Sequence, residues 1–112
     1  MSAPPEVFDF KDYKSYLNAR LDHPLAGGRG ARSRLSQAMR CQTAYTAQVL
    51  RGSAELSNEQ AEAANQFLGH TEEEGDFLLL LVQRQRAGTP SLRTRLDRQL
   101  EKIRERRAHL AA

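Results

Sequence analysis

The chain has 112 residues, which suits one domain with a modest hydrophobic core and leaves too little length for two. Charged residues make up 28% of it, the net charge is +3 and the pI is about 9.4, a balance that favours an anionic partner. The longest apolar run, at 77–82, is too short to span a bilayer, and the N-terminus lacks the pattern of an export signal. We therefore expect a soluble protein that is not exported.

Charge is distributed unevenly along the chain. Residues 1–54 carry eight Lys or Arg against four Asp or Glu, residues 55–76 carry seven acids and no base, and residues 83–112 carry nine bases against three acids. A polyanion is therefore expected to bind residues of 1–54 or of 83–112, the two ranges with an excess of bases. A single cysteine excludes an internal disulfide, and the three His residues lack metal-ligand spacing, so we expect no metal or other cofactor.

The N-terminal part predicts a tail followed by one helix. Residues 1–8 contain two prolines and small side chains, and we predict a disordered tail there. Asp9 is expected to cap a helix that runs to about residue 22, with Asp12 in its first turn, where acids suit the helix dipole. Apolar residues at three- and four-residue spacings predict its buried face: Phe10, Tyr13, Tyr16, Leu17 and Leu21.

The Gly- and Arg-rich segment at 23–33 predicts an irregular connection, which Ser33 closes as the expected cap of the next helix. That helix, at about 34–39, is too short to persist alone and needs tertiary packing. Leu35 and Met39 can face the core, while Ser36 and Ala38 are small enough for a close crossing with another helix.

A second short helix is predicted at about 44–51, after the break "RCQT". Cys41 suits a buried position in the turn, Gln42 or Thr43 is expected to cap the helix, and Gly52 ends it. Thr46 and Val49 are expected to face inward. The expected outward face is short, polar or amphipathic, and consists of Thr43, Ala44, Tyr45, Gln48 and Arg51.

Two helix starts are marked by capping boxes, "SNEQ" at 57–60 and "TEEE" at 71–74. Gly69 is expected to stop the first of these helices and Gly88 the second. The first has one inward stripe, and residues 77–82 of the second are apolar all round, which predicts the most buried helix of the fold. The inward stripe of the first consists of Ala61, Ala64, Phe67 and Leu68.

The last helix is predicted to begin at "TPS", with Thr89 as its cap and Pro90 at its first position. Its thin apolar stripe needs a partner surface, either the core of its own chain or the same helix in a second copy. The residues of this possible homodimer contact are Leu92, Leu96, Leu100, Ile103 and Leu110. No strand pattern competes anywhere, so the fold class is all-α with five or six helices.

The stretch "LSQAMRCQTAYTAQVLRGSAELS" resembles the helix-turn-helix of the lambda-repressor-like (Xre-type) DNA-binding domains. Together with "VFDFKDYKSYL" before it and "FLLLLVQRQRAGT" after it, the stretch is also similar to a bacterial group of transcriptional regulators with a VFxYxDYRxFL-type start. The resemblance covers about residues 6–89. It implies a domain at 9–88 with its helix-turn-helix at about 33–52, followed by an amphipathic helix at 89–112.

This resemblance implies a sequence-specific transcriptional regulator whose recognition helix, at about 43–51, lies in the major groove of double-stranded DNA. The expected base contacts are Thr43, Ala44, Tyr45 and Gln48, and the expected phosphate contacts are Arg32, Arg34, Arg40, Gln42 and Arg51. Two features depart from the family pattern. Arg40 stands at the usual turn glycine, and Ser53 and Ala54 replace the usual basic pair after Gly52.

Two less specific interpretations are also open. The polar residues of the second short helix also suit a solvated surface, and the domain also suits a protein-interaction module that kept the fold and lost DNA binding. The helix dipole explains the acids of "EEEGD" at a helix start. Cys41 suits the core, and His70 suits an exposed turn. We expect no enzyme activity, membrane contact or small-molecule ligand. The expected location is the bacterial cytoplasm, at the nucleoid.

Overall fold

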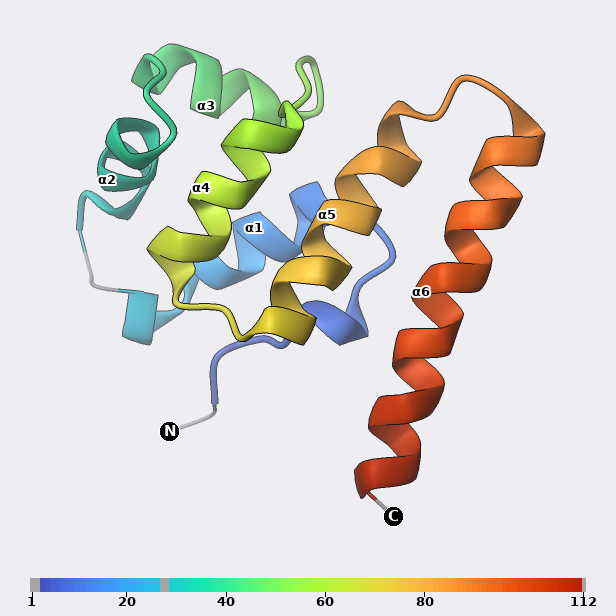
Figure 1. The fold of residues 1–112 in the computed structure, drawn as a ribbon. Coiled ribbons are helices and arrows are strands. Elements are labelled where there is room, and N and C mark those ends of the chain that lie inside the picture. Colours follow the sequence, from blue (N-terminus) through green and yellow to red (C-terminus); the bar gives the residue numbers. More distant parts are fainter. Residues whose placement is uncertain (1–2, 27–28, 112) are drawn as a thin grey trace.

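The computed structural model describes residues 3–26 and 29–111, and over these residues the chain is all-α, without a β-strand. Helices α4, α5 and α6 lie side by side in antiparallel order, α1 lies behind them, and α2 and α3 form a corner at one end (Figure 1). The elements are η1 (Val7–Asp9), α1 (Tyr13–Asp22), η2 (Pro24–Ala26), α2 (Ala31–Ala38), α3 (Thr43–Arg51), α4 (Asn58–Leu68), α5 (Glu72–Arg86) and α6 (Pro90–Ala111).

The N-terminal segment belongs to the core, so the predicted tail over residues 1–8 is too long. Val7 and Phe8 lie in η1 and are 1% and 7% exposed. The prediction that Asp9 caps the first helix is also wrong, because Asp12 takes that place and accepts from the backbone N–H groups of residues 14 and 15. Phe10 precedes the helix in extended backbone and packs edge-on against Tyr16.

Helix α2 begins earlier than predicted, at Ala31, and Ser33 lies inside it rather than capping it. The residue before the helix is Gly30, whose φ of +88° is a left-handed conformation that glycine adopts without strain. Ala31 is buried at 4% exposed and therefore holds this first turn against the core. Capping rules favoured Ser33 because they consider only neighbouring residue types and do not include the burial of Ala31.

Both capping boxes are confirmed. Ser57 accepts from the backbone of Gln60 while the Gln60 side chain accepts from Ser57, and Thr71 and Glu74 do the same at the start of α5. Gly69 ends α4 in a left-handed conformation as predicted. The predicted stop at Gly88 is one residue late, because α5 ends at Arg86 and its C-cap is Ala87, where the backbone is already extended.

Helix α5 forms the centre of the core. Its residues Phe77, Leu78, Leu81 and Val82 are at most 1% exposed, while Leu79 and Leu80 are half-buried on its other side. The predicted stripe of α4 packs against this core, with Ala61 and Ala64 fully buried and Phe67 and Leu68 half-buried. Within the described residues, no helix combines the length and the apolar composition that crossing a membrane requires.

Helix α6 folds back onto its own chain, with Thr89 accepting from the backbone N–H of Leu92 at its start. The central residues of its apolar stripe are buried, and its end residues Leu92 and Leu110 are 44% and 79% exposed. The face that a homodimer through this stripe would use is therefore covered inside one chain. The buried central residues are Leu96, Leu100 and Ile103.

Candidate nucleic-acid interface

The corner between α2 and α3 is held by a chain of small polar groups. Ser36 is 1% exposed and its hydroxyl donates to the carbonyl of Arg32 at 2.8 Å. Its single proton is thereby committed, so the hydroxyl of Thr46, 2.6 Å away, donates to Ser36. The thiol of Cys41 lies 3.4 Å from Thr46 and completes the chain. The inward positions predicted for Thr46 and Val49 are confirmed, and both are 1% exposed.

Arg40 keeps the backbone conformation that a glycine usually takes at the end of a helix. The N–H of Cys41 donates to the carbonyl of Ser36, and the N–H of Arg40 donates to that of Gln37, which is the Schellman pattern. Arg40 stands at its left-handed position with φ +56°, the only such residue besides glycines within 3–26 and 29–111. A side chain there costs about 1–2 kcal/mol, and Arg40 is exposed.

The outer face of α3 presents four polar or small side chains to solvent: Gln42, Thr43, Ala44 and Gln48. Gln42 occupies the N-cap position, but its side chain accepts no capping hydrogen bond, so the predicted side-chain cap is not formed. Tyr45 differs from its neighbours, because it is half-buried and its hydroxyl donates to the backbone carbonyl of Glu55. Its ring therefore lies at the side of the exposed face, and its hydroxyl is engaged within the fold.

All the predicted phosphate contacts are exposed. Arg40 and Arg51 are exposed, and neither has an ion pair with any residue in the described part of the chain. Arg32 pairs with Asp22 at 2.9 Å on the surface, where such a pair is worth only about 0–1 kcal/mol. Arg34 donates to the carbonyl of residue 29. Between residues 23 and 54 the sequence contains five arginines and no acid.

Sequence reasoning missed a polar cluster that fixes the segment after α3. Lys14 is 8% exposed, and its ammonium donates to the Ala54 carbonyl at 2.6 Å and to the Glu55 carboxylate at 3.0 Å. The hydroxyl of Tyr13 donates to the other oxygen of Glu55 at 2.7 Å and accepts from the N–H of Leu56. We call Tyr13, Lys14 and Glu55 the 54–56 clamp. It ties the end of the helix-turn-helix region to α1.

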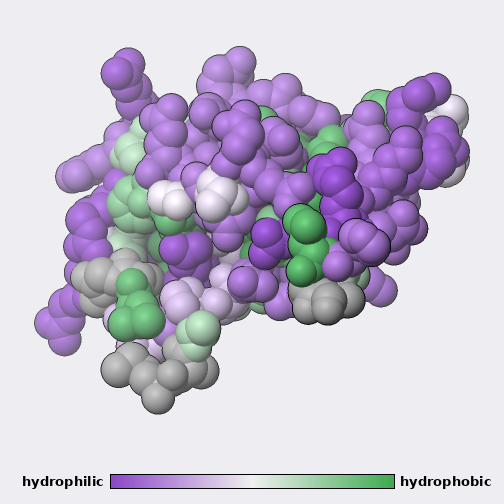
Figure 2. Space-filling view, turned by 60° about the horizontal axis from the view of Figure 1, so that its bottom comes forward, coloured by the Kyte–Doolittle hydropathy of each residue, from purple (hydrophilic) through white to green (hydrophobic). Residues whose placement is uncertain are grey.

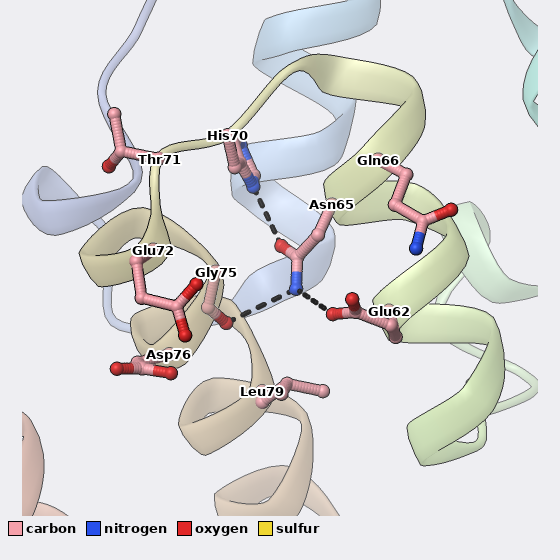
Figure 3. A pocket seen from close by; sticks show the side chains of 9 residues that line it. All are labelled: Glu62, Asn65, Gln66, His70, Thr71, Glu72, Gly75, Asp76 and Leu79. Carbon is pink, nitrogen blue, oxygen red and sulfur yellow. Dashed lines mark hydrogen bonds between the residues drawn. The ribbon is translucent and has the colours of Figure 1, made fainter.

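A hollow of about 210 Å³ lies between α4 and α5, and His70 and Asn65 are among the residues that line it (Figure 3). His70 was predicted to be exposed, but it is half-buried, and its Nδ1 lies 2.7 Å from Asn65 Oδ1. The amide nitrogen of Asn65 donates to the Gly75 carbonyl and to Glu62. Asn65 Oδ1 must therefore accept, which places the His70 proton on Nδ1.

The other ring nitrogen of His70 completes a directed network. Arg20 donates to the hydroxyl of Tyr16 at 2.9 Å, so that hydroxyl in turn donates to His70 Nε2 at 2.6 Å. The ring is therefore held in its neutral form, because a second proton would set two donors against each other. Burial lowers the pKa of His70, with a smaller opposing effect from Glu74. The hydrogen bonds beside the hollow therefore hold α1, α4 and α5 together.

We expect the free energy of unfolding to fall as the pH drops through and below 6.5, the ordinary pKa of His. The unfolded chain then takes up a proton that the folded chain resists, so the stabilisation is complete above that pH and lost below it. Urea unfolding between pH 7.5 and 5, above the range of carboxylate titration, measures the effect. His70→Gln should flatten the dependence, and replacement of the exposed His109 should leave it unchanged.

In the described part of the chain, no three His, Cys, Asp or Glu side chains are grouped as ligands of a metal ion would be. Comparison with protein families, curated proteins and solved structures gives no match for this chain.

Proposed function

We propose that this chain is a sequence-specific DNA-binding regulator of the lambda-repressor-like (Xre-type) kind. In this proposal α3 enters the major groove and α2 crosses the phosphate backbone. The observation that carries it is the exposed outer face of α3 standing in a stretch with five arginines and no acid. A duplex offers phosphates on either side of a groove lined by base edges, which this combination complements.

Roles follow from the exposure of each side chain. Gln48 carries an amide that can donate to and accept from adenine in a bidentate manner, and Thr43 and Ala44 are small enough for close approach to base edges. Arg40, Arg51 and the readily released Arg32 suit phosphates on the flanks. Because the hydroxyl of Tyr45 is engaged by Glu55, the proposal gives Tyr45 a part in positioning α3 instead of a base contact.

The backbone of Arg40 adds independent support. A glycine there would avoid the cost of the left-handed conformation, so an arginine is stabilising only through what its side chain contacts. Within the described residues it forms no ion pair, which leaves an external anion as the natural partner. Arg40→Gly should therefore keep or raise the thermal stability while weakening duplex binding.

The proposal is tested by duplex selection from a random pool, followed by titration of the selected site at several salt concentrations. Phosphate contacts make log K fall with log salt, and Arg40→Gly should reduce that slope by about 1. Gln48→Ala should weaken the selected site by about 1–3 kcal/mol with little change on unrelated duplexes. Gln66→Ala, a change of the same type at an exposed position on α4, serves as the matched control.

Absence of duplex binding at low salt would refute the proposal and favour a protein-interaction module of the same fold. Equal loss on all duplexes for Gln48→Ala would remove Gln48 from the base contacts while leaving the rest of the interface in place.

A further inference from the structure

A broad face remains beside the proposed DNA interface, formed by α4, α5 and α6 (Figure 1). Leu79 and Gln83 on α5 run along its middle, and both line the hollows toward α4 and toward α6. The groove between α5 and α6 has a volume of about 500 Å³, with Leu79, Leu80 and Ile103 among its apolar residues. Ile103 is 6% exposed, so the two leucines provide most of the accessible apolar surface.

The two edges of this face carry opposite charge. The edge on α4 has Glu59 and Glu62, and the hollow beside them is shared with Leu79 and Gln83. The edge on α6 is a basic stripe at spacings of three and four residues: Arg95, Arg98, Lys102 and Arg106. All four are exposed, and in the ranges that the structure describes only Arg106 has an ion pair, with Glu73.

Two of the three acids of α6 lie on its other flank. Asp97 pairs with Arg84 and Glu101 pairs with Arg104. Both pairs lie on the side of α6 that faces away from the groove between α5 and α6. Helix α6 is therefore a three-sided helix, with a buried apolar side, an acidic flank and a basic flank that borders the open groove. Figure 2, which views the molecule from below, shows a surface that is mainly hydrophilic with small separate hydrophobic areas.

The strip between the acidic edge and the basic edge holds Leu79, Leu80 and Gln83, with Asp76 at its end. Edges of opposite charge on the two sides of this strip complement the same surface in a second copy. A twofold axis parallel to α5 carries α4 of one copy over α6 of the other, so that each acidic edge faces a basic edge twice. An axis across α5 would set like charges together. We propose that a second copy of this chain docks on the α4–α5–α6 face, with α5 packed against α5 along Leu79 and Gln83. This inference does not depend on the proposed DNA binding.

The dimensions of the face suit a small interface. Three helices spaced about 9 Å apart and about 22 Å long cover roughly 600 Å² on each copy, or about 1,200 Å² in total. That area lies at the lower end of specific protein–protein interfaces. With few exposed apolar groups and several charge pairs, the dimer is expected to be weak and to dissociate as salt rises.

Sedimentation velocity of the full chain across concentration, at low and high salt, measures the association. The basic-edge variant Arg95→Glu/Lys102→Glu and the acidic-edge variant Glu59→Lys/Glu62→Lys each set like charges together in their own dimers. Each should raise the dissociation constant about tenfold or more. Glu101→Lys, on the acidic flank of α6 where Glu101 pairs with Arg104, is the control that should leave association unchanged.

The decisive measurement is an equimolar mixture of the two variants. In a mixed dimer of this symmetry the reversed edges face each other and the native edges face each other, so association should return to that of the native chain. A native chain that stays monomeric at low salt overturns the proposal, as does a mixture no better associated than its components. Circular dichroism of each variant checks that the helices are retained. Duplex binding by the monomer is a separate readout, so failure of either proposal can be told from failure of the other.

Discussion

Phe8→Ala is expected to lower the free energy of unfolding by about 3 kcal/mol, within the range of buried Phe-to-Ala changes. Phe8 is 7% exposed and its ring meets that of Phe77 edge-on, with centroids 5.2 Å apart. The guanidinium of Arg107 lies 4.2 Å from the centre of the Phe8 ring, so truncation also removes a cation–π contact between the two ends of the chain. Urea unfolding monitored by circular dichroism at pH 7.5 measures the loss.

A matched control is Leu25→Ala, which also truncates a large apolar side chain but at a position that is 57% exposed. Its effect should stay within about 0.5 kcal/mol of the native chain. If Phe8→Ala were equally mild, η1 would not belong to the core, and the disordered tail expected from the sequence would be the better description.

The sequence did not predict this N-terminal docking because its cause is not local. Val7 and Phe8 have no helical or alternating pattern around them, and the prolines before them favour a tail. Their partners are on α5 and α6, and Arg104 adds to the docking by donating to the carbonyls of Phe8 and Phe10. Contacts of that separation in sequence leave no periodic signal.

Features whose cause lies within one turn were predicted well. The capping boxes at Ser57 and Thr71 need only residues three positions apart, and both were found in the structure. Gly52 and Gly69 end their helices with positive φ as expected. Of the two wrong caps, Asp9 was chosen over Asp12, a residue of the same type three positions later. Ser33 was chosen over Gly30, which makes no side-chain cap, because the burial of Ala31 starts the helix earlier.

The candidate interface was predictable in part for the same reason. The exposure of Gln48 and the burial of Thr46 and Val49 follow from helical spacing, and the structure has them as expected. The engagement of Tyr45 and the burial of Lys14 depend on the path of the chain after Gly52, which no spacing rule describes. The 54–56 clamp was therefore invisible in the sequence, although it determines how α3 is held.

Glu55→Ala is expected to lower the free energy of unfolding by about 2 kcal/mol and to weaken duplex binding as well. The side chain of Lys14 is only 10% exposed. Without Glu55 its ammonium keeps the Ala54 carbonyl as its one hydrogen-bond partner. Removing one member of a fully buried pair costs about 3–5 kcal/mol, and the smaller value here reflects the side chain of Glu55, which is 33% exposed. Urea unfolding and duplex titration of the same samples measure both effects.

The comparison of variants separates charge from packing. Glu55→Gln keeps an oxygen that can accept from Tyr13 but loses the charge beside Lys14, so its loss should be intermediate. Glu105→Ala removes an exposed acid of the same kind that has no ion pair among the described residues, and it should have little effect. Because the clamp lies behind α3 rather than on its outer face, any loss of duplex affinity in Glu55→Ala must come from a less rigid α3. Unchanged affinity in a destabilised Glu55→Ala chain would show that the α2–α3 corner, held by Ser36 and Thr46, positions the helix by itself.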